Sequence, residues 1–111
     1  MTKAVFTVKD GRIVQVAVNG HTGYAVAGED IVCAAVSSVV QGAALGVLKV
    51  AKAEATYRTD DRKGALSLAL AEGQKETAAH DAEVILRTAL AAVEDIAKGY
   101  SQFVKVEVKE L

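Results

Sequence analysis

The stretch Asn19–Gln41 reads NGHTGYAVAGEDIVCAAVSSVVQ and separates two different apolar patterns. Before it, Val14–Val18 is apolar and rich in valine like a strand, and Asn19-Gly20 is a turn signal. Within it, a second apolar run begins at Ile31, and this run is long enough to need a helix. We therefore predict a strand, a glycine-rich loop and a helix in succession, so that the strand end and the helix start can be neighbours.

His21 and Cys33 lie on either side of this loop, and Cys33 is the only cysteine. Asp30 is a good N-cap residue, which would put Cys33 at about the third helical position. Unpaired N–H groups and the helix dipole favour a thiolate there, and a nearby imidazolium would favour it further. Thiol catalysis needs such a nucleophile with a base within reach. By residue type alone, a buried structural cysteine and a solvated loop histidine remain the alternatives.

The loop between them contains glycines that give the backbone freedom to hinge, namely Gly20, Gly23 and Gly28. Tyr24 is its one large side chain, and it either touches substrate or only pins the loop. We expect a substrate-binding loop here, with an ordinary connecting loop as the alternative.

Two further polar residues flank Cys33. Ser37 follows it by four residues on the same helix face, so its hydroxyl bonds either near the sulfur or back to its own helix. Asp30 either caps the helix, which is the favoured role, or orients His21. One carboxylate cannot serve both uses fully.

Gly20-His21 followed by Gly28–Ser37, read as GEDIVCAAVS, resembles the signature of the ribosomal-processing cysteine protease family, Prp. Members of that family are small α/β proteins with a His/Cys dyad that remove an N-terminal extension from a large-subunit ribosomal protein. The resemblance implies that His21 is the general base and Cys33 the nucleophile, with Ser37 in a functional role. It also implies a homodimer and cleavage after a bulky apolar residue such as Phe.

Composition limits the other classes of function. The 111 residues are expected to form one domain, 1–111, and the hydrophobic fraction of 51% without proline argues against disorder. With 13 basic and 14 acidic residues, the formal net charge of −1 offers no general electrostatic attraction for nucleic acid. A single cysteine and the lack of a signal-peptide pattern favour the cytoplasm. Two histidines and one cysteine do not make a zinc ligand set, so we expect no metal and no cofactor.

The segment Ile31–Leu48 has no formal charge and approaches the roughly 18 apolar residues that suggest a membrane span. Serine, glycine and glutamine in its middle, and alanine and valine in place of leucine, favour a core helix instead. A helix that is apolar on every side must be covered all round. We therefore expect helix contact between two copies in a homodimer, and no contact with a membrane.

The remaining elements follow from period and turn residues. The helix after Gln74 has one apolar and one charged face, with Thr77 as its expected N-cap and Gly99 at its C′ position. His80 is expected to be exposed or capping. The predicted order ββαββαβ gives an α/β (α+β) fold in which a mainly antiparallel sheet packs against two helices, with strands at Lys3–Lys9, Arg12–Val18, Glu54–Thr59, Ala65–Leu70 and Phe103–Lys109 and the first helix at about Ile31–Val50.

A cysteine endopeptidase is the leading functional hypothesis, with the N-terminal extension peptide of a ribosomal protein as its partner. One alternative is a non-catalytic, dimeric binding module for ribosome assembly in which Cys33 is structural. A second alternative is a thiol-dependent hydrolase or acyl-transfer enzyme that acts on a small ester or amide.

Overall fold

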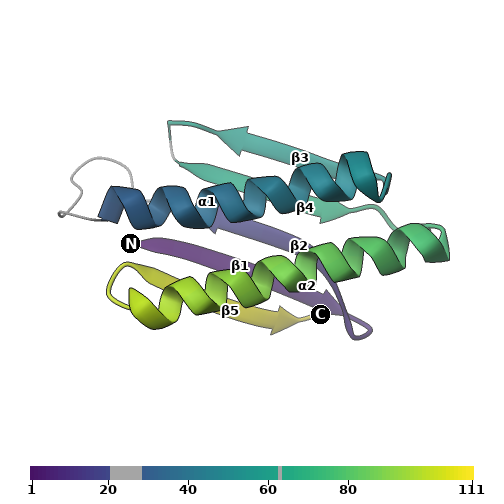
Figure 1. Cartoon of the computed structure of the whole chain (residues 1–111). Helices are drawn as coiled ribbons and strands as arrows, with labels where there is room; N and C mark the ends of the chain where they lie inside the picture. The colour runs from purple at the N-terminus through teal and green to yellow at the C-terminus, as the bar shows by residue number, and fades with distance from the viewer. Residues whose placement is uncertain (21–28, 63) are drawn as a thin grey trace.

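The computed structural model describes residues 1–20, 29–62 and 64–111, with only the backbone of 29 and 30. The elements follow the predicted ββαββαβ order, which confirms the small α+β fold (Figure 1). They are β1 (Thr2–Lys9), β2 (Arg12–Asn19), α1 (Glu29–Leu45) with a π-helical turn η1 (Gly46–Val50), β3 (Ala55–Asp60), β4 (Ala65–Leu70), α2 (Glu76–Gly99) and β5 (Val104–Glu110).

The five strands form one sheet in the order β3-β4-β2-β1-β5. All neighbours are antiparallel except β1 and β5, which are parallel. The predicted turn between β1 and β2 is confirmed, because Asp10 and Gly11 have φ values of 52° and 79°, as a two-residue hairpin turn of type I′ requires. The centre of the sheet is thus a tight hairpin, and its open end carries the start of β1 and the end of β2.

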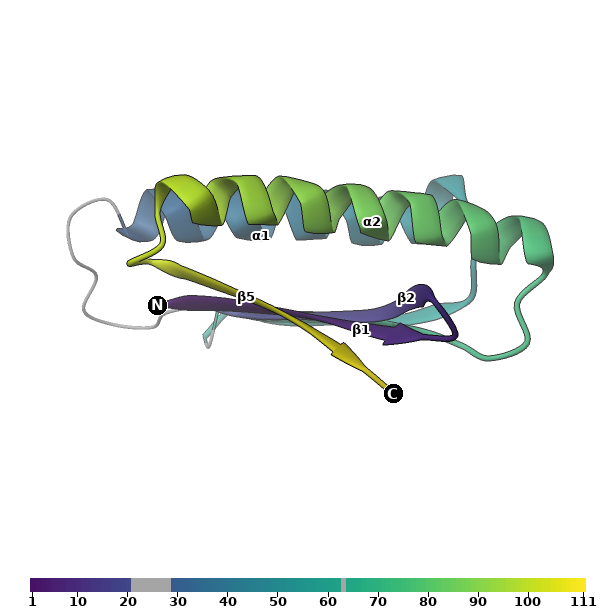
Figure 2. The same ribbon diagram turned by 90° about the horizontal axis from the view of Figure 1, so that it is seen from below.

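Both helices cover the same face of the sheet and run in opposite directions (Figures 1 and 2). Strand alternation turns one set of apolar side chains toward them, and full burial of each contributes about 1.5–3 kcal/mol. The largest fully buried apolar side chains are Phe6, Ile13, Leu68, Leu86, Val16, Val18, Val36, Val40, Val47 and Val93. This core holds the start of α1 over the start of β1 and the end of β2.

The helix Ile31–Val50 has a mean hydropathy of 2.0 and is long and apolar enough to cross a membrane. A core helix passes the same test, and here 33% of the segment is buried inside the fold. One stripe of the helix, including Val36 and Val40, packs into the core. The described residues do not cover its outer face, which is made of Ala34, Ala35, Ser38, Gln41, Gly42 and Leu45.

The predicted helix starts and the predicted end of the second helix need correction. Helix α1 begins at Glu29, so Asp30 is inside its first turn and not at the N-cap. Helix α2 begins at Glu76, so the prediction of Thr77 as its N-cap was also wrong. Extended Lys75 precedes it without a side-chain cap, and an acidic residue in the first turn suits the helix dipole. Gly99 is its last helical residue and not the C′ residue.

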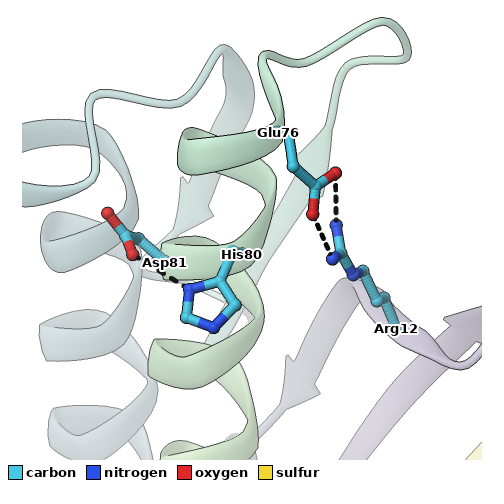
Figure 3. A network of polar contacts seen from close by, with 4 residues as sticks. All are labelled: Arg12, Glu76, His80 and Asp81. Carbon is cyan, nitrogen blue, oxygen red and sulfur yellow. Dashed lines mark hydrogen bonds and ion pairs between the residues drawn. The ribbon is translucent and has the colours of Figure 1, made fainter.

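An ion pair fastens the β1–β2 hairpin to the start of α2 (Figure 3). Arg12 Nη2 lies 2.5 Å from Glu76 Oε1, and its hydrogen bond, with its charge, holds the pKa of the Glu76 carboxyl below its ordinary value. Nearby, His80 Nδ1 lies 3.2 Å from Asp81 Oδ1, and both side chains are exposed. The prediction of an exposed His80 is confirmed. The start of α2, to which it belongs, lies at the end of the molecule opposite the start of α1 (Figure 1).

Candidate active site

Four segments meet at the end of the sheet where α1 begins: the start of β1, the end of β2, the first turns of α1 and the turn before β4 (Figure 1). They bring together Thr2, Gly20, Cys33 and Gly64. The predicted proximity of a strand end and a helix start is therefore found for Gly20 and Cys33. These residues are more than ten positions apart in the sequence, and the hairpin and the α1 packing place them side by side.

Cys33 carries a free, half-buried thiol. The Thr2 hydroxyl donates a hydrogen bond to its Sγ atom over 2.7 Å. Thr2 itself is only 1% exposed, and its backbone N–H donates to the Phe103 carbonyl over 2.8 Å. The sulfur therefore lies against a hydroxyl that the sheet holds rigidly.

Thr2 is a site residue that the sequence analysis missed. It occupies the helix-facing side of β1, in alternation with Ala4 and Phe6, which are fully buried. The strand expected from the sequence starts at Lys3, one residue after Thr2, so the burial of this hydroxyl and its need for a partner follow only from the observed start of β1.

Gly20 directly follows β2 and lies next to the start of β1. Its N–H donates to the Gly64 carbonyl oxygen over 2.7 Å. A Cβ atom at this position would lie 2.7 Å from that oxygen and 3.1 Å from Cys33 Sγ. Close approach of backbone and sulfur is thus a reason for glycine here, in addition to the conformational freedom predicted.

The position of Cys33 in α1 also differs from the expectation. It is the fifth residue of the helix and not about the third, because α1 begins at Glu29. Only the first four N–H groups of a helix lack internal partners, and the dipole effect falls off within the first turn. The Thr2 hydroxyl, and not the helix terminus, is therefore the donor that the structure places on this sulfur.

Other candidates receive no position from the structure. His21, Gly23, Tyr24 and Gly28 lie outside the described residues, as does the side chain of Asp30. Ser37 is half-buried one turn beyond Cys33, and no hydrogen bond joins these two described residues. Within residues 1–20, 29–62 and 64–111, no cluster of three His, Cys, Asp or Glu side chains could hold a metal ion.

A small α+β domain with a half-buried thiol, a hydroxyl donor and a backbone in close approach belongs to the class of proteins that can use a cysteine as nucleophile. The sequence matches the family described as Cysteine protease Prp over residues 1–105, so the chain belongs to this family of cysteine proteases.

Relatives agree with this assignment along the whole chain. The ribosomal processing cysteine protease Prp of Staphylococcus aureus is 26% identical over 104 residues, which cover 93% of this chain and 94% of that protein. A crystal structure of the S. aureus protease with a substrate peptide has a TM-score of 0.86 at 25% identity, over 98% of this chain and 100% of that one.

Two other solved structures have the same fold. One shows the S. aureus protease with a covalently linked product peptide, at a TM-score of 0.80 and 26% identity, over 98% of this chain and 100% of that one. The other is a Streptococcus mutans protein with a TM-score of 0.85 at 22% identity, covering 100% of this chain and 96% of that one.

Proposed function

We propose that this single-domain protease acts in the cytoplasm and removes the N-terminal extension of a large-subunit ribosomal protein. Cys33 is the nucleophile and His21 the general base. The observation that carries the proposal is the position of Cys33 Sγ, which is half-buried between the Thr2 hydroxyl and Gly20. The S. aureus relative, named as a ribosomal processing protease and solved with a covalently linked product peptide, supports a covalent route.

In this mechanism His21 accepts the thiol proton, and the Cys33 thiolate attacks the carbonyl carbon of the scissile bond. The carbon–nitrogen bond then breaks, the amine leaves with the proton from His21, and a thioester remains. Water activated by His21 hydrolyses the thioester and restores the thiol. Backbone N–H groups near the start of α1 stabilise the oxyanion of each tetrahedral intermediate.

The remaining candidates have supporting roles in the proposal. Asp30, in the first turn of α1, stabilises the start of the helix through the interaction of its charge with the helix dipole. Ser37 lies one turn beyond the thiol and contacts the substrate backbone. The substrate-binding loop comprises Gly20, Gly23, Tyr24 and Gly28, and it receives a bulky apolar side chain such as Phe at the cleavage site.

Mass spectrometry of the candidate substrate tests this function. A large-subunit ribosomal protein with its N-terminal extension is incubated with the wild type, and in parallel with wild type whose thiol was blocked by iodoacetamide. We expect shortening at one bond by the active protein alone. An intact substrate that a pull-down retains would instead identify a binding module. Turnover of small esters without any peptide cleavage would identify the alternative hydrolase.

We propose a homodimer formed through the outer face of the helices, with a second copy as the occupant. The outer residues of α1 are mostly small, and Ile31 and Val84 are 77% and 51% exposed. An apolar groove between the helices continues this surface and is lined by Val39, Ala43, Val84, Ile85, Thr88, Ala89 and Ala92. Apolar surface of this kind is characteristic of an interface between subunits.

Light scattering tests the dimer. We expect a mass of twice the 11.5 kDa chain for the wild type, and a monomer for Val84→Asp, because a buried unpaired carboxylate is costly. Val108→Asp, an exposed valine on β5, is the matched control and should remain dimeric. A monomeric wild type at high concentration would refute the proposal.

A further inference from the structure

We infer that Thr2 is a positioning residue of the protease, which holds Cys33 Sγ in place through its hydroxyl. The inference rests on the proposed function in one respect, namely that Cys33 is the nucleophile. It concerns a residue outside the glycine-rich stretch, about thirty positions away in the sequence, on a different element.

The direction of the hydrogen bond decides the chemical effect. A thiol can either donate to the Thr2 oxygen or accept from its hydroxyl, whereas a thiolate has no hydrogen and can only accept. A hydrogen bond to a charged acceptor is about twice as strong as one between neutral groups. The Thr2 hydroxyl is therefore a partner that the sulfur keeps in both forms, and it holds Sγ in one position before and after the proton leaves.

Burial strengthens this effect. Thr2 is 1% exposed, so water does not compete for its hydroxyl. Its backbone is anchored to Phe103, and β1 pairs with both β2 and β5, which fixes the strand on each side. Gly20, which follows β2 next to the start of β1, lies so close that an added Cβ would be 3.1 Å from Sγ. Contacts with two neighbouring strands therefore restrict the position of the sulfur.

The test compares Thr2→Val, which keeps the shape and loses the hydroxyl, with Thr2→Ser, which keeps the hydroxyl. The readout is the rate of Cys33 alkylation by iodoacetamide from pH 5 to 10, together with kcat and KM for the peptide substrate. At neutral pH we expect Thr2→Val to react about tenfold more slowly, as loss of one hydrogen bond to a charged group implies. Thr2→Ser should stay close to the wild type.

The split between kcat and KM separates this role from a structural one. Thr2→Val should lower kcat and leave KM close to that of the wild type, because the hydroxyl contacts the sulfur and not the substrate, and Thr2→Ser should restore kcat. A merely structural defect would instead lower the melting temperature and change both constants. Thr7→Val is the matched control, since Thr7 is a second buried threonine of β1 at 3% exposure, and its kcat should equal that of the wild type.

The outcomes distinguish this inference from the proposed function. If the wild type cleaves its substrate but Thr2→Val has the wild-type kcat and alkylation rate, the positioning role is wrong and the protease mechanism stands. If the wild type cleaves nothing, the proposed function fails regardless of the alkylation profile. Should Thr2→Val not fold, judged by thermal melting, Thr2→Ala provides the same comparison with Thr2→Ser.

Discussion

Cys33→Ala is expected to fold and to lose peptide cleavage by about 10³-fold or more, because loss of the nucleophile removes the covalent route entirely. The fold should survive, since the side chain is half-buried and alanine favours the helix. The replacement does leave the buried Thr2 hydroxyl without its sulfur partner, which costs about 1–3 kcal/mol. We therefore expect a small drop in thermal stability beside a complete loss of turnover, measured by melting and by mass spectrometry of the substrate.

Cys33→Ser separates these two effects. Its oxygen can still pair with Thr2, so its stability should exceed that of Cys33→Ala, while an unactivated hydroxyl remains a poor nucleophile at neutral pH. His21→Ala should reduce the rate of peptide cleavage by about 10²–10⁴-fold, because the general base is missing. Cleavage by Cys33→Ala at a rate near that of the wild type would exclude Cys33 as the nucleophile.

The parts of the fold that depend on neighbouring residues were predictable. Asp10-Gly11 fixed the first hairpin, because few residue pairs tolerate two positive φ values in succession. The parallel pairing of β1 with β5 had no such local signal, since Thr2 and its partner Val104 lie near opposite ends of the sequence. Both predicted N-cap residues, Asp30 and Thr77, lie within the first turns of their helices. The start of α2 could not be found from a capping side chain, because Lys75 precedes the helix without one.

The site divides in the same way. Cys33 could be proposed from its residue type and its place near the start of an apolar helix. The family match agrees with a thiol enzyme. Thr2 could not, because threonine is common in strands and the sequence does not show which hydroxyl a distant sulfur will meet. The close approach at Gly20 was equally hidden, since it depends on the Gly64 turn two elements later.

Gly20→Ala is expected to lower peptide cleavage by about 10²-fold, the loss that a displacement of about 1 Å at a reacting group can cause. The new Cβ would lie 2.7 Å from the Gly64 carbonyl oxygen and 3.1 Å from Cys33 Sγ. The Gly64 oxygen cannot stay at the first distance, so the hydrogen bond from Gly20 N–H to Gly64 must lengthen. If Gly20 moves toward Cys33 instead, the sulfur must shift from Thr2. Cleavage kinetics with thermal melting measure both consequences.

The matched control is Gly99→Ala at the last residue of α2, where an added Cβ would meet nothing within 4 Å. Alanine there should raise the stability of the protein slightly through its higher helix propensity, with cleavage unchanged. Opposite effects of one chemical change at two glycines would separate close packing at the thiol from general backbone freedom. If Gly20→Ala cleaved at the wild-type rate, the contact between Gly20 and the sulfur would have no catalytic importance, and the thiol would be positioned by Thr2 and α1 alone.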